Sequence, residues 1–559
     1  MRKPNWPAAA LLWILSALLC SVAAAASTPR FEVTFPRQLE RGPITGRLIV
    51  VIAKQLEPEP RLLLDLLRSP AAFGVDIEAV RAGTAMVVDS NAAGYPLHDL
   101  GELPRGDYYV QALLIRYTHV RRSDEHELWV PLSPTGLIAA RFPGNLHSKV
   151  QKLTLDPAQQ FVVPIELSEA IAPYSEEPDT QWLKTVRIKS EILSKFWGTP
   201  IYFGARVLLP RGFDDHPQSR YPGIYVFGHG TPFFFDTDPA TNTERAIARA
   251  RSANLQTGYD FYQTWIRDDF PRVVGICPII PSPYNAESYA VNSANNGPWG
   301  DAITRELMPY LERKFRLIAR PHARIVEGAS TGGWEALAMQ LYYPDLIGGA
   351  WVFNPDPIDF SRYQLNDIYS DENMFSVPTS AWTRTERPMK RSNEGQVLWT
   401  MRQIAQFEAM LGSRGRSHYQ FDIWQATYGP AGADGYPVLL FDKKTGAIDK
   451  NVVAYMREHG YDLTEYTRRN WATLGPKLNG KLNFFAGEQD DFFLNLGVYN
   501  FQDMLHERHD PPAVARFEYG RPKKGHNWHL TDFSEMVREM AAHIRRTAPA
   551  GEDAQEWNY

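Results

Sequence analysis

The sequence predicts an all-β domain followed by a larger α/β domain with a mostly parallel sheet. Residues 28–171 form strand-like segments that alternate or are β-branched, separated by turn-forming Gly, Pro, Asn and Asp. From residue 182 onward, short apolar runs without clear alternation take turns with helical patterns, which is typical of strands buried on both faces. The 559 residues suffice for two to four domains, and 44% hydrophobic with 22% charged content is that of a globular protein.

The N-terminus predicts an export signal. Arg2 and Lys3 precede an apolar run over Ala8–Leu19, and small residues follow up to a predicted cleavage near Ala26. Residues 1–26 are therefore expected to be a signal peptide. The apolar run is shorter than the ~20 residues of a membrane span. We expect an exported product, periplasmic or extracellular, without a membrane span after cleavage.

Net charge and cysteine content bear on nucleic-acid binding and on disulfide formation. The formal net charge of −5 does not predict a surface for nucleic acid. Once Cys20 leaves with the signal, Cys277 is the remaining cysteine, so no disulfide within the chain is expected. Cys277 lies in the apolar run "RVVGICPII", which predicts a buried and unreactive thiol.

Residues 27–171 are predicted to form a β-sandwich of immunoglobulin-like build. The predicted strands are "RFEVTF", "GRLIVVI", "TAMVVDS", "DYYVQALLIRYTHV", "SKVQKLTL" and "QQFVVPIEL". The stretch "LLLDLLR" is a short helical interruption. Residues 172–184 are polar, contain two prolines, and are expected to be the linker.

Residues 185–548 carry the predicted α/β domain. Its strands are expected at "GIYVFG", "RVVGICPII", "ARIVEG", "GGAWVFNP", "KLNFFAG" and "ARFEYG". Helical stripes run through "GDAITRELMPYLERKF" and "TDFSEMVREMAAHIRR". Pro309 falls inside the first of these, so a kink or a boundary is expected there.

A long insertion at about 356–475 interrupts this alternation. It holds two helical patterns, "GQVLWTMRQIAQFEAML" and "NVVAYMREHGY", among irregular segments. Such insertions are lids or binding loops, or elaborations that protect the sheet. Its aromatic residues would either line an acyl or sugar pocket or form core. The residues in question are Trp382, Trp399, Tyr419, Trp424 and Tyr428.

The stretch "RIVEGASTGGWEAL" contains a candidate nucleophile. Gly328 to Gly332 spell G-x-S-x-G, between a predicted strand and a predicted helix. A catalytic serine is held in such a tight bend, where flanking glycines let the chain segments pass closely. Ser330 is therefore the candidate nucleophile, and the N–H of Thr331 at the helix start is placed to face an oxyanion.

Two aspartates follow the predicted strand "KLNFFAG". Asp490 and Asp491 lie just past its carboxyl end, where catalytic groups gather in parallel sheets, and Glu488 is a weaker candidate. Aspartates at this position are also common turn residues, so the position alone does not assign a role. Asp490 and Asp491 are both candidates for the acid.

Two histidines follow the last predicted strand. His526 lies on the loop where a catalytic base is expected, while His529 at the helix start could equally cap or pack. Their spacing suggests metal binding, but no further cluster of ligands supports it. The acidic segment from Asp236 lacks the glycine of a calcium loop. We expect neither metal nor cofactor.

The oxyanion hole requires a second donor from an earlier strand end. The run "YPGIYVFGHGTPFFF" is an apolar strand that leads into Gly228-His229-Gly230. The backbone N–H of Gly230 or Thr231 is the predicted second donor, beside that of Thr331. His229 is predicted to be structural, because His526 fits the base better.

Taken together, these motifs resemble the esterase-D-like branch of the α/β-hydrolases, which includes feruloyl and enterochelin-type esterases. The resemblance covers about 183–546 and is most specific at the nucleophile turn. It implies Ser330 as nucleophile, His526 as base and the acid in a G-x-x-D run, here Gly487 to Asp490. The duplicate Asp491 and the large insertion depart from the family pattern.

The sequence thus predicts an exported serine esterase that forms an acyl-enzyme with a Ser-His-Asp triad. The expected substrate is a small-molecule or glycan-linked ester. Two alternatives stay open. One is a serine peptidase on the same fold, and the other is a non-catalytic carbohydrate- or wall-binding protein with an inactive hydrolase domain.

Overall fold

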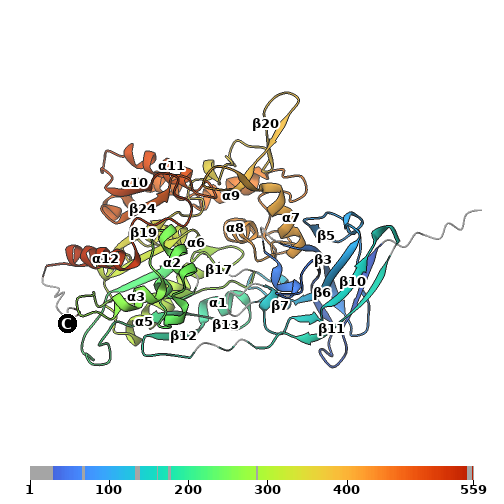
Figure 1. Cartoon of the computed structure of the whole chain (residues 1–559). Coiled ribbons are helices and arrows are strands. Elements are labelled where there is room, and N and C mark those ends of the chain that lie inside the picture. The colour runs from blue at the N-terminus through green and yellow to red at the C-terminus, as the bar shows by residue number, and fades with distance from the viewer. Residues whose placement is uncertain are drawn as a thin grey trace, which may run out of the picture.

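An all-β domain and an α/β domain lie at opposite ends of the molecule, and the insertion lies between them on one side (Figure 1). The computed structural model describes residues 29–65, 69–132, 139–159, 161–173, 175, 178–228, 230–284, 287–550, 557 and 559. The predicted signal peptide, part of the predicted linker and His229 lie outside these residues. The domain boundaries of the sequence analysis stay predictions.

The N-terminal domain is built from strands and short 3-10 turns, in agreement with the sequence. The strands are β1 (Arg30–Thr34), β2 (Ile44–Ala53), β3 (Ala71–Val80), β4 (Met86–Val88), β5 (Ala93–Tyr95), β6 (Gly106–Arg116), β7 (Thr118–Arg121), β8 (Glu127–Val130), β9 (Leu146–Ser148), β10 (Gln151–Leu155) and β11 (Val162–Ala170). The stretch predicted as a helical interruption begins with a 3-10 turn, Pro60–Leu63.

The main strands of this domain follow one hydrogen-bonded path, β4-β1-β11-β9-β6-β2-β3-β5, with β10 beside β6. The long strand β11 makes this possible. Its first half pairs in parallel with β1, and its second half pairs in antiparallel with β9 after a bulge. The hairpin β7-β8 leaves this path, and Val120 and Leu128 join the core of the α/β domain instead.

The α/β domain holds an eight-stranded sheet in the order β12-β13-β15-β14-β18-β19-β24-β25. The strands are β12 (Leu183–Ser190), β13 (Ile201–Leu208), β14 (Gly223–Phe227), β15 (Val274–Ile279), β18 (Arg324–Ala329), β19 (Gly349–Phe353), β24 (Leu482–Gly487) and β25 (Ala515–Gly520). Pairing is antiparallel between β12, β13 and β15 and parallel from β15 to β25. The prediction of a mostly parallel sheet is confirmed.

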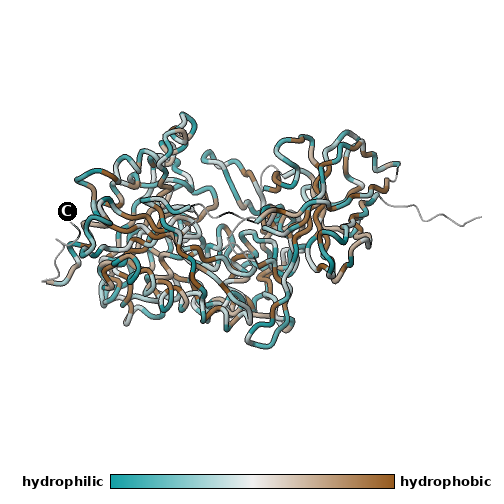
Figure 2. The backbone as a smooth tube through the Cα atoms, turned by 90° about the horizontal axis from the view of Figure 1, so that it is seen from below, coloured by the Kyte–Doolittle hydropathy of each residue, from teal (hydrophilic) through white to brown (hydrophobic). Residues whose placement is uncertain are grey.

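Helices cover this sheet. They are α1 (Glu191–Trp197), α2 (Glu244–Ser252), α3 (Gly258–Trp265), α4 (Trp299–Ala302), α5 (Met308–Lys314), α6 (Thr331–Tyr342), α11 (Asn495–His506) and α12 (Phe533–Thr547). The central helix α6 contacts β14, β18 and β19, and α12 packs with α3. Apolar residues concentrate along the strands of both domains (Figure 2).

The boundary predicted at Pro309 is confirmed. Between α4 and α5 the chain forms a π-helical segment, Ile303–Leu307, and returns to α-helix at Met308. Proline has no N–H to donate, so it is tolerated at the first positions of the new helical segment. The predicted apolar stripe is preserved, because Leu307 and Leu311 are both buried.

The insertion contains more regular structure than the sequence predicted. Its elements are β20 (Ser376–Pro378), β21 (Arg384–Glu386), β22 (Pro388–Arg391), β23 (Val397–Thr400), α7 (Met401–Leu411), α8 (Gln420–Tyr428), α9 (Lys450–Glu458) and α10 (Leu463–Leu478). The stretch predicted as one helix over residues 395–411 was partly wrong, since its first part is strand β23. Thr400 and Gln403 form a capping box that begins the helix at Met401.

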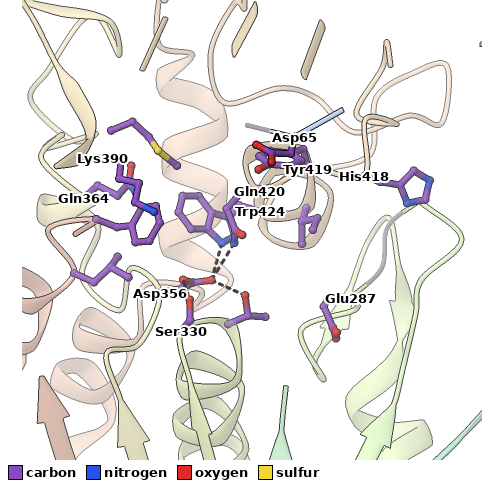
Figure 3. Close-up of a pocket in the computed structure, with 15 residues that line it drawn as sticks. Asp65, Glu287, Ser330, Asp356, Gln364, Lys390, His418, Tyr419, Gln420 and Trp424 are labelled. Atoms are coloured by element: carbon purple, nitrogen blue, oxygen red, sulfur yellow. Dashed lines mark hydrogen bonds between the residues drawn. The ribbon is translucent and has the colours of Figure 1, made fainter. Parts of the chain in front are cut away.

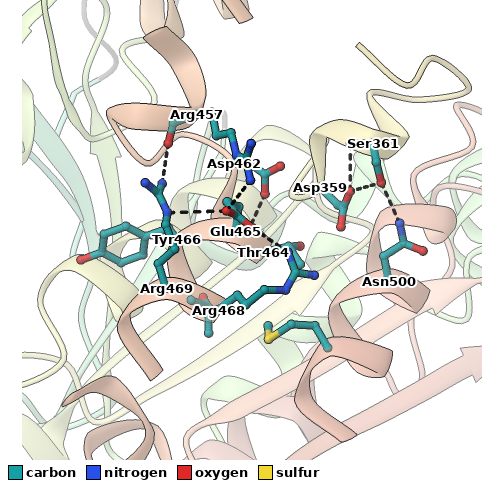
Figure 4. A network of polar contacts seen from close by, with 12 residues as sticks. Asp359, Ser361, Arg457, Asp462, Thr464, Glu465, Tyr466, Arg468, Arg469 and Asn500 are labelled. Atoms are coloured by element: carbon teal, nitrogen blue, oxygen red, sulfur yellow. Dashed lines mark hydrogen bonds and ion pairs between the residues drawn. The ribbon is translucent and has the colours of Figure 1, made fainter. Parts of the chain in front are cut away.

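A network of polar contacts fixes the insertion around the start of α10 (Figure 4). Asp462 accepts hydrogen bonds from the N–H groups of Glu465 and Phe360 and from the hydroxyl of Tyr369. Glu465 in turn pairs with Arg457 at 2.8 Å and with Arg468 at 2.6 Å. The network joins both ends of the insertion, so the long segment is held as one body.

The insertion also packs against the N-terminal domain through α7. Strand β2 is buried along its whole length, and alternate residues face different cores. Leu48 and Val50 face the interior of the β domain, whereas Ile49 and Val51 pack with Phe407 and Met410 of α7. The face of β2 that would otherwise meet water is therefore covered by the insertion.

Arg47 strengthens this contact. Its buried guanidinium donates to the carbonyl oxygens of Ala409 at 2.6 Å and Met410 at 3.0 Å, and pairs with Asp76 at 3.0 Å. These carbonyls lie in the last turn of α7, where helix carbonyls lack partners within the helix. Arg47 thus caps a helix of the insertion from within the β domain.

We predict that Arg47→Met lowers the free energy of unfolding by about 3 kcal/mol, because it leaves the α7 carbonyls without their buried donor and removes one of the two arginines that pair with Asp76. Urea unfolding followed by circular dichroism measures this loss. The matched control is Arg30→Met, which removes the partly exposed Arg30–Glu32 pair and is expected to cost less than about 1 kcal/mol. Equal losses in both variants would contradict the helix-capping role of Arg47.

Candidate active site

Ser330 occupies a sharp turn between β18 and α6. Its backbone has φ 60° and ψ −120°, a conformation that costs a non-glycine residue roughly 1–3 kcal/mol. The turn is held from the neighbouring strand β19. The N–H of Ser330 donates to the Phe353 carbonyl at 3.0 Å, and the Ser330 carbonyl accepts from the N–H of Asp356 at 3.0 Å.

The glycines of the motif allow this close packing. A Cβ on Gly328 would lie 2.4 Å from the Gly332 carbonyl carbon. A Cβ on Gly332 would lie 2.1 Å from the Phe227 oxygen, at the end of strand β14. Both distances are too short for any other residue. The loop that follows β14 therefore begins beside the Ser330 turn, as the sequence predicted.

His526 and Asp490 form a tightly paired unit. His526 Nδ1 lies 2.7 Å from Asp490 Oδ2. The other carboxylate oxygen, Oδ1, accepts from the N–H groups of Phe492 at 2.8 Å and Leu494 at 3.2 Å. Because a carboxylate only accepts, the Nδ1 atom carries the hydrogen and Nε2 is left with the free lone pair of a base.

The neighbouring Asp491 has a different role. Its Oδ1 accepts the backbone N–H of His526 at 3.1 Å, so it fixes the loop and not the ring. Asp490 is fully buried, whereas Asp491 is half-buried. Glu488 lies at the surface side of this loop, where it accepts from the N–H of Lys523 at 3.0 Å. The duplicated aspartates are thereby distinguished by geometry.

The charges around His526 stabilise its protonated form. Burial opposes the charged imidazole, but Asp490, Asp356 and Asp491 outweigh it and raise the pKa of His526 above 6.5. His529 differs, because burial lowers its pKa to about 4. The ring of His529 stacks on Phe353 with ring centres 4.6 Å apart, so it packs in the core.

The hydroxyl of Ser330 contacts a carboxylate that the sequence analysis did not consider. In the described part of the chain its acceptor is Asp356 Oδ1, 3.3 Å away, and not His526. Catalytic hydrogen bonds in ligand-free sites are often long or misaligned. The hydroxyl must therefore exchange its contact with Asp356 for one with the imidazole before it can act as nucleophile.

Asp356 also connects the nucleophile turn to the insertion. Its Oδ2 accepts from the Tyr289 hydroxyl at 2.5 Å and the Thr331 hydroxyl at 3.0 Å. It further accepts from the Gln420 amide at 3.0 Å and the Trp424 indole at 3.3 Å, both on α8. Figure 3 shows Gln420 and Trp424 reaching down to Asp356 above Ser330.

Ser330, Asp356, Gln420 and Trp424 line a cavity of about 410 Å³. Three parts of the chain line it: the β domain through Asp65, the α/β domain through Ser330, and the insertion through α8. The charged side chains of the lining are Asp65, Glu287, Asp356 and Lys390. Its aromatic side chains are Tyr419, Trp424 and Phe492. The volume suits a small molecule or one end of a larger one.

The predicted aromatic residues divide between pocket and core. Tyr419 and Trp424 line the cavity, while Trp399 and Tyr428 are buried away from it. Trp382 is 94% exposed on the hairpin β20-β21. The insertion thus supplies a wall of the cavity, although only part of its aromatic content is used there.

The second oxyanion donor stays a prediction. Thr331 begins α6 and lines the cavity. Gly230 has φ 103°, and the Thr231 hydroxyl donates to the Phe235 carbonyl at 3.3 Å. Among the described residues that line the cavity, neither Gly230 nor Thr231 is present.

Cys277 is buried as predicted, and burial raises the pKa of its thiol. Within the described ranges, no three His, Cys, Asp or Glu side chains are grouped so as to hold a metal ion. No helix of the described chain combines the length and apolar character needed to cross a membrane.

The sequence carried a signal for Asp356 that the analysis passed over. Asp356 follows β19 by three residues, just as Asp490 follows β24, and both strands are neighbours in the sheet. Carboxyl ends of adjacent parallel strands meet at one edge, so the same rule that selected Asp490 also applies to Asp356. Tyr289 and Gln420 come from segments without such a signal.

Comparison with known proteins agrees with this geometry. Residues 202–410, which include Ser330 and Asp356, match the family model described as "Putative esterase". No curated protein matches the chain.

Several solved structures are similar to part of the chain. An S-formylglutathione hydrolase from Agrobacterium tumefaciens has 11% identity and a TM-score of 0.32, covering 67% of this chain and 99% of that chain. The S-formylglutathione hydrolase FrmB from Staphylococcus aureus has 13% identity and a TM-score of 0.29, covering 65% and 99%. A ferulic acid esterase from Anaeromyces mucronatus, in complex with ferulic acid, has 10% identity and a TM-score of 0.28, covering 66% and 93%.

The strand order and the nucleophile turn define the C-terminal domain as an α/β-hydrolase domain. Residues 202–410 of this domain match the esterase family model, which supports a carboxylic ester hydrolase. The predicted α/β-hydrolase fold is confirmed, and the family match over residues 202–410 agrees with the resemblance found in the sequence.

We predict that His526 titrates above pH 6.5, and that Asp490→Asn lowers its pKa, because the amide no longer stabilises the imidazolium. Nuclear magnetic resonance of ¹³C-labelled histidine, followed from pH 5 to pH 9, measures this. His529 serves as the internal control, since it stays neutral over the range. An unchanged pKa of His526 in Asp490→Asn would show that the pair at 2.7 Å does not set the charge of the ring.

Proposed function

We propose that Ser330, His526 and Asp490 form the catalytic triad of an exported esterase that acts through an acyl-enzyme. The observation that carries this proposal is the combination of the strained Ser330 turn after β18 with the buried His526–Asp490 pair after β24 and β25 of the same sheet. Asp356 connects the two, since it contacts Ser330 and influences the charge of His526.

In the first step, Ser330 Oγ attacks the ester carbonyl carbon and His526 Nε2 takes its proton. Asp490 holds the ring in the tautomer with hydrogen on Nδ1 and stabilises the imidazolium. His526 then gives the proton to the departing alcohol, which leaves an acyl group on Ser330. In the second step water, deprotonated by His526, releases the acid and restores the hydroxyl.

The oxyanion of the tetrahedral intermediate requires backbone donors. The N–H of Thr331 lies at the N-terminus of α6, where the unpaired N–H groups and the helix dipole favour negative charge. The loop with Gly230 and Thr231 is the proposed source of the second donor. Removal of one such donor costs other enzymes about 10²–10³ in kcat.

We predict that Ser330→Ala abolishes ester hydrolysis and labelling by a fluorophosphonate, because both need the hydroxyl as nucleophile. The measurements are turnover of short-chain 4-nitrophenyl esters and detection of the labelled peptide. Ser361→Ala is the matched control, since Ser361 lies in the polar network of Figure 4 and outside the cavity. Retained hydrolysis by a folded Ser330→Ala would refute the assignment.

The two aspartates are predicted to respond differently. Asp490→Asn removes the charge that orients and stabilises the ring, and kcat is expected to fall by about 10³–10⁴. Asp491→Asn affects a backbone contact of the loop, and a fall of roughly tenfold or less is expected, about the value of one ordinary hydrogen bond. Steady-state kinetics on one ester compare them. The reverse order would assign the acid role to Asp491.

Substrate panels and fluorophosphonate labelling distinguish the esterase from the two alternative functions. A panel of esters and matching anilides distinguishes an esterase from a peptidase on this fold. A protein that is not labelled by fluorophosphonate but binds glycans would be the non-catalytic alternative. The proposed substrate is a small-molecule or glycan-linked ester, and export with cleavage near Ala26 is tested by N-terminal sequencing of the secreted product.

A further inference from the structure

Asp356 is a buried carboxylate without a cationic partner among its hydrogen-bond donors. It is 3% exposed, and each donor to it is a neutral hydroxyl, amide or indole. Buried carboxylates in proteins are almost always paired with a positive charge. Burial therefore raises the pKa of Asp356, and its carboxylate lines the cavity with no cationic partner other than His526 when that ring is protonated.

The two oxygens of Asp356 are used unequally. Oδ2 accepts from four donors, which fixes the orientation of the carboxylate. Oδ1 accepts from the Ser330 hydroxyl alone, at 3.3 Å, among the described hydrogen bonds, and Asp356 lines the cavity. A carboxylate oxygen has room for more than one donor. Once Ser330 turns to His526, Oδ1 is ready to accept a hydrogen bond from a substrate.

The lining of the cavity holds more acidic than basic side chains. Asp65 and Glu287 line the same cavity, against Lys390 as the single cationic side chain of the described lining. The ammonium of Lys390 lies over the ring of Phe492 at 4.7 Å. The cavity thus favours a cation over an anion.

The short distance between Ser330 Oγ and Asp356 Oδ1 places that cation next to the reacting carbonyl. Ser330 Oγ bonds to the carbonyl carbon, and Oδ1 of Asp356 lies 3.3 Å from Oγ. A substituent on the carbon beside the carbonyl therefore comes within hydrogen-bond reach of Oδ1. An ammonium group at that position donates N–H bonds to the carboxylate and neutralises it at the same time.

We propose that Asp356 is a specificity-determining residue that receives the ammonium group of an ester whose acyl part carries a primary amine next to the carbonyl. This inference rests on the proposed function of Ser330. A neutral acyl group of the same shape leaves the buried carboxylate unpaired, which disfavours that ester. The orienting donors Gln420 and Trp424 belong to α8, so the insertion sets this preference.

The test compares L-alanine methyl ester with methyl isobutyrate at pH 7, because the two differ by an ammonium in place of a methyl group. The expected ratio of kcat/KM in the unmodified protein is about 10² in favour of the alanine ester. In Asp356→Asn the ratio is expected to fall to about one. General damage to the nucleophile turn lowers both rates alike and cancels in the ratio.

Asp359→Asn is the matched control. Asp359 is a buried aspartate of the insertion that lies in the network of Figure 4 and outside this cavity. Its ratio is expected to equal that of the unmodified protein. A ratio of one or less in the unmodified protein, with Ser330-dependent hydrolysis of both esters, would overturn the inference and leave the proposed function intact.

An ammonium on the alcohol side is a separate source of the same charge. Choline isobutyrate and its neutral counterpart, 3,3-dimethylbutyl isobutyrate, form the second pair of substrates. A preference for the choline ester without one for the alanine ester would overturn the placement on the acyl side. If no ester is hydrolysed and Ser330 takes no fluorophosphonate label, the proposed function fails and this inference fails with it.

Discussion

The strained turn at Ser330 is the constraint on which the rest of the site depends. Its φ of 60° is held by hydrogen bonds to Phe353 and Asp356 on the adjacent strand end. A strained backbone at a functional residue persists only when several surrounding contacts each hold it in that conformation. Here the segment that follows β19 fixes the serine backbone and also supplies the carboxylate that contacts its hydroxyl, so position and electrostatics come from one piece of chain.

The large insertion and the β domain support this arrangement. Asp356 needs donors on its outer side, and α8 supplies Gln420 and Trp424. Helix α8 is held by its neighbour α7, which packs on the outer face of β2 and is capped by Arg47. The β domain therefore acts as a support for one wall of the cavity, and Asp65 brings it directly into the lining.

The sequence predicted the parts of the fold that rest on local pattern. Strands buried on both faces, the break at Pro309 and the turn around Ser330 are encoded by hydrophobic runs, proline and glycine, whose effects act over a few residues. His526 and Asp490 were located by the rule that catalytic groups follow strand ends. That rule does not choose between Asp490 and Asp491, because the choice depends on which side chain faces a ring on another loop.

What the sequence did not predict depends on contacts between distant segments. Gln420, Tyr289 and Asp356 are separated by 64 to 131 residues, yet they share one hydrogen-bonded centre. No periodicity within the insertion distinguishes Trp424, which lines the cavity, from Tyr428, which is buried in the core. Such side chains acquire a role only when helices of the insertion pack against the sheet, and that packing is a tertiary event.

Two carboxylates with different surroundings act on the same imidazole, and their positions indicate different roles. Asp490 binds Nδ1 and receives two backbone N–H groups, so its carboxylate is fixed in place. Asp356 lies on the side of Ser330, and its charge faces the substrate. A neutral acyl group would leave Asp356 to stabilise the imidazolium before the reaction begins, which weakens His526 as a base at neutral pH. An ammonium bound at Asp356 compensates that charge and lowers the pKa of His526, so that the base becomes available when the matching substrate is present. Recognition and activation would then depend on the same carboxylate.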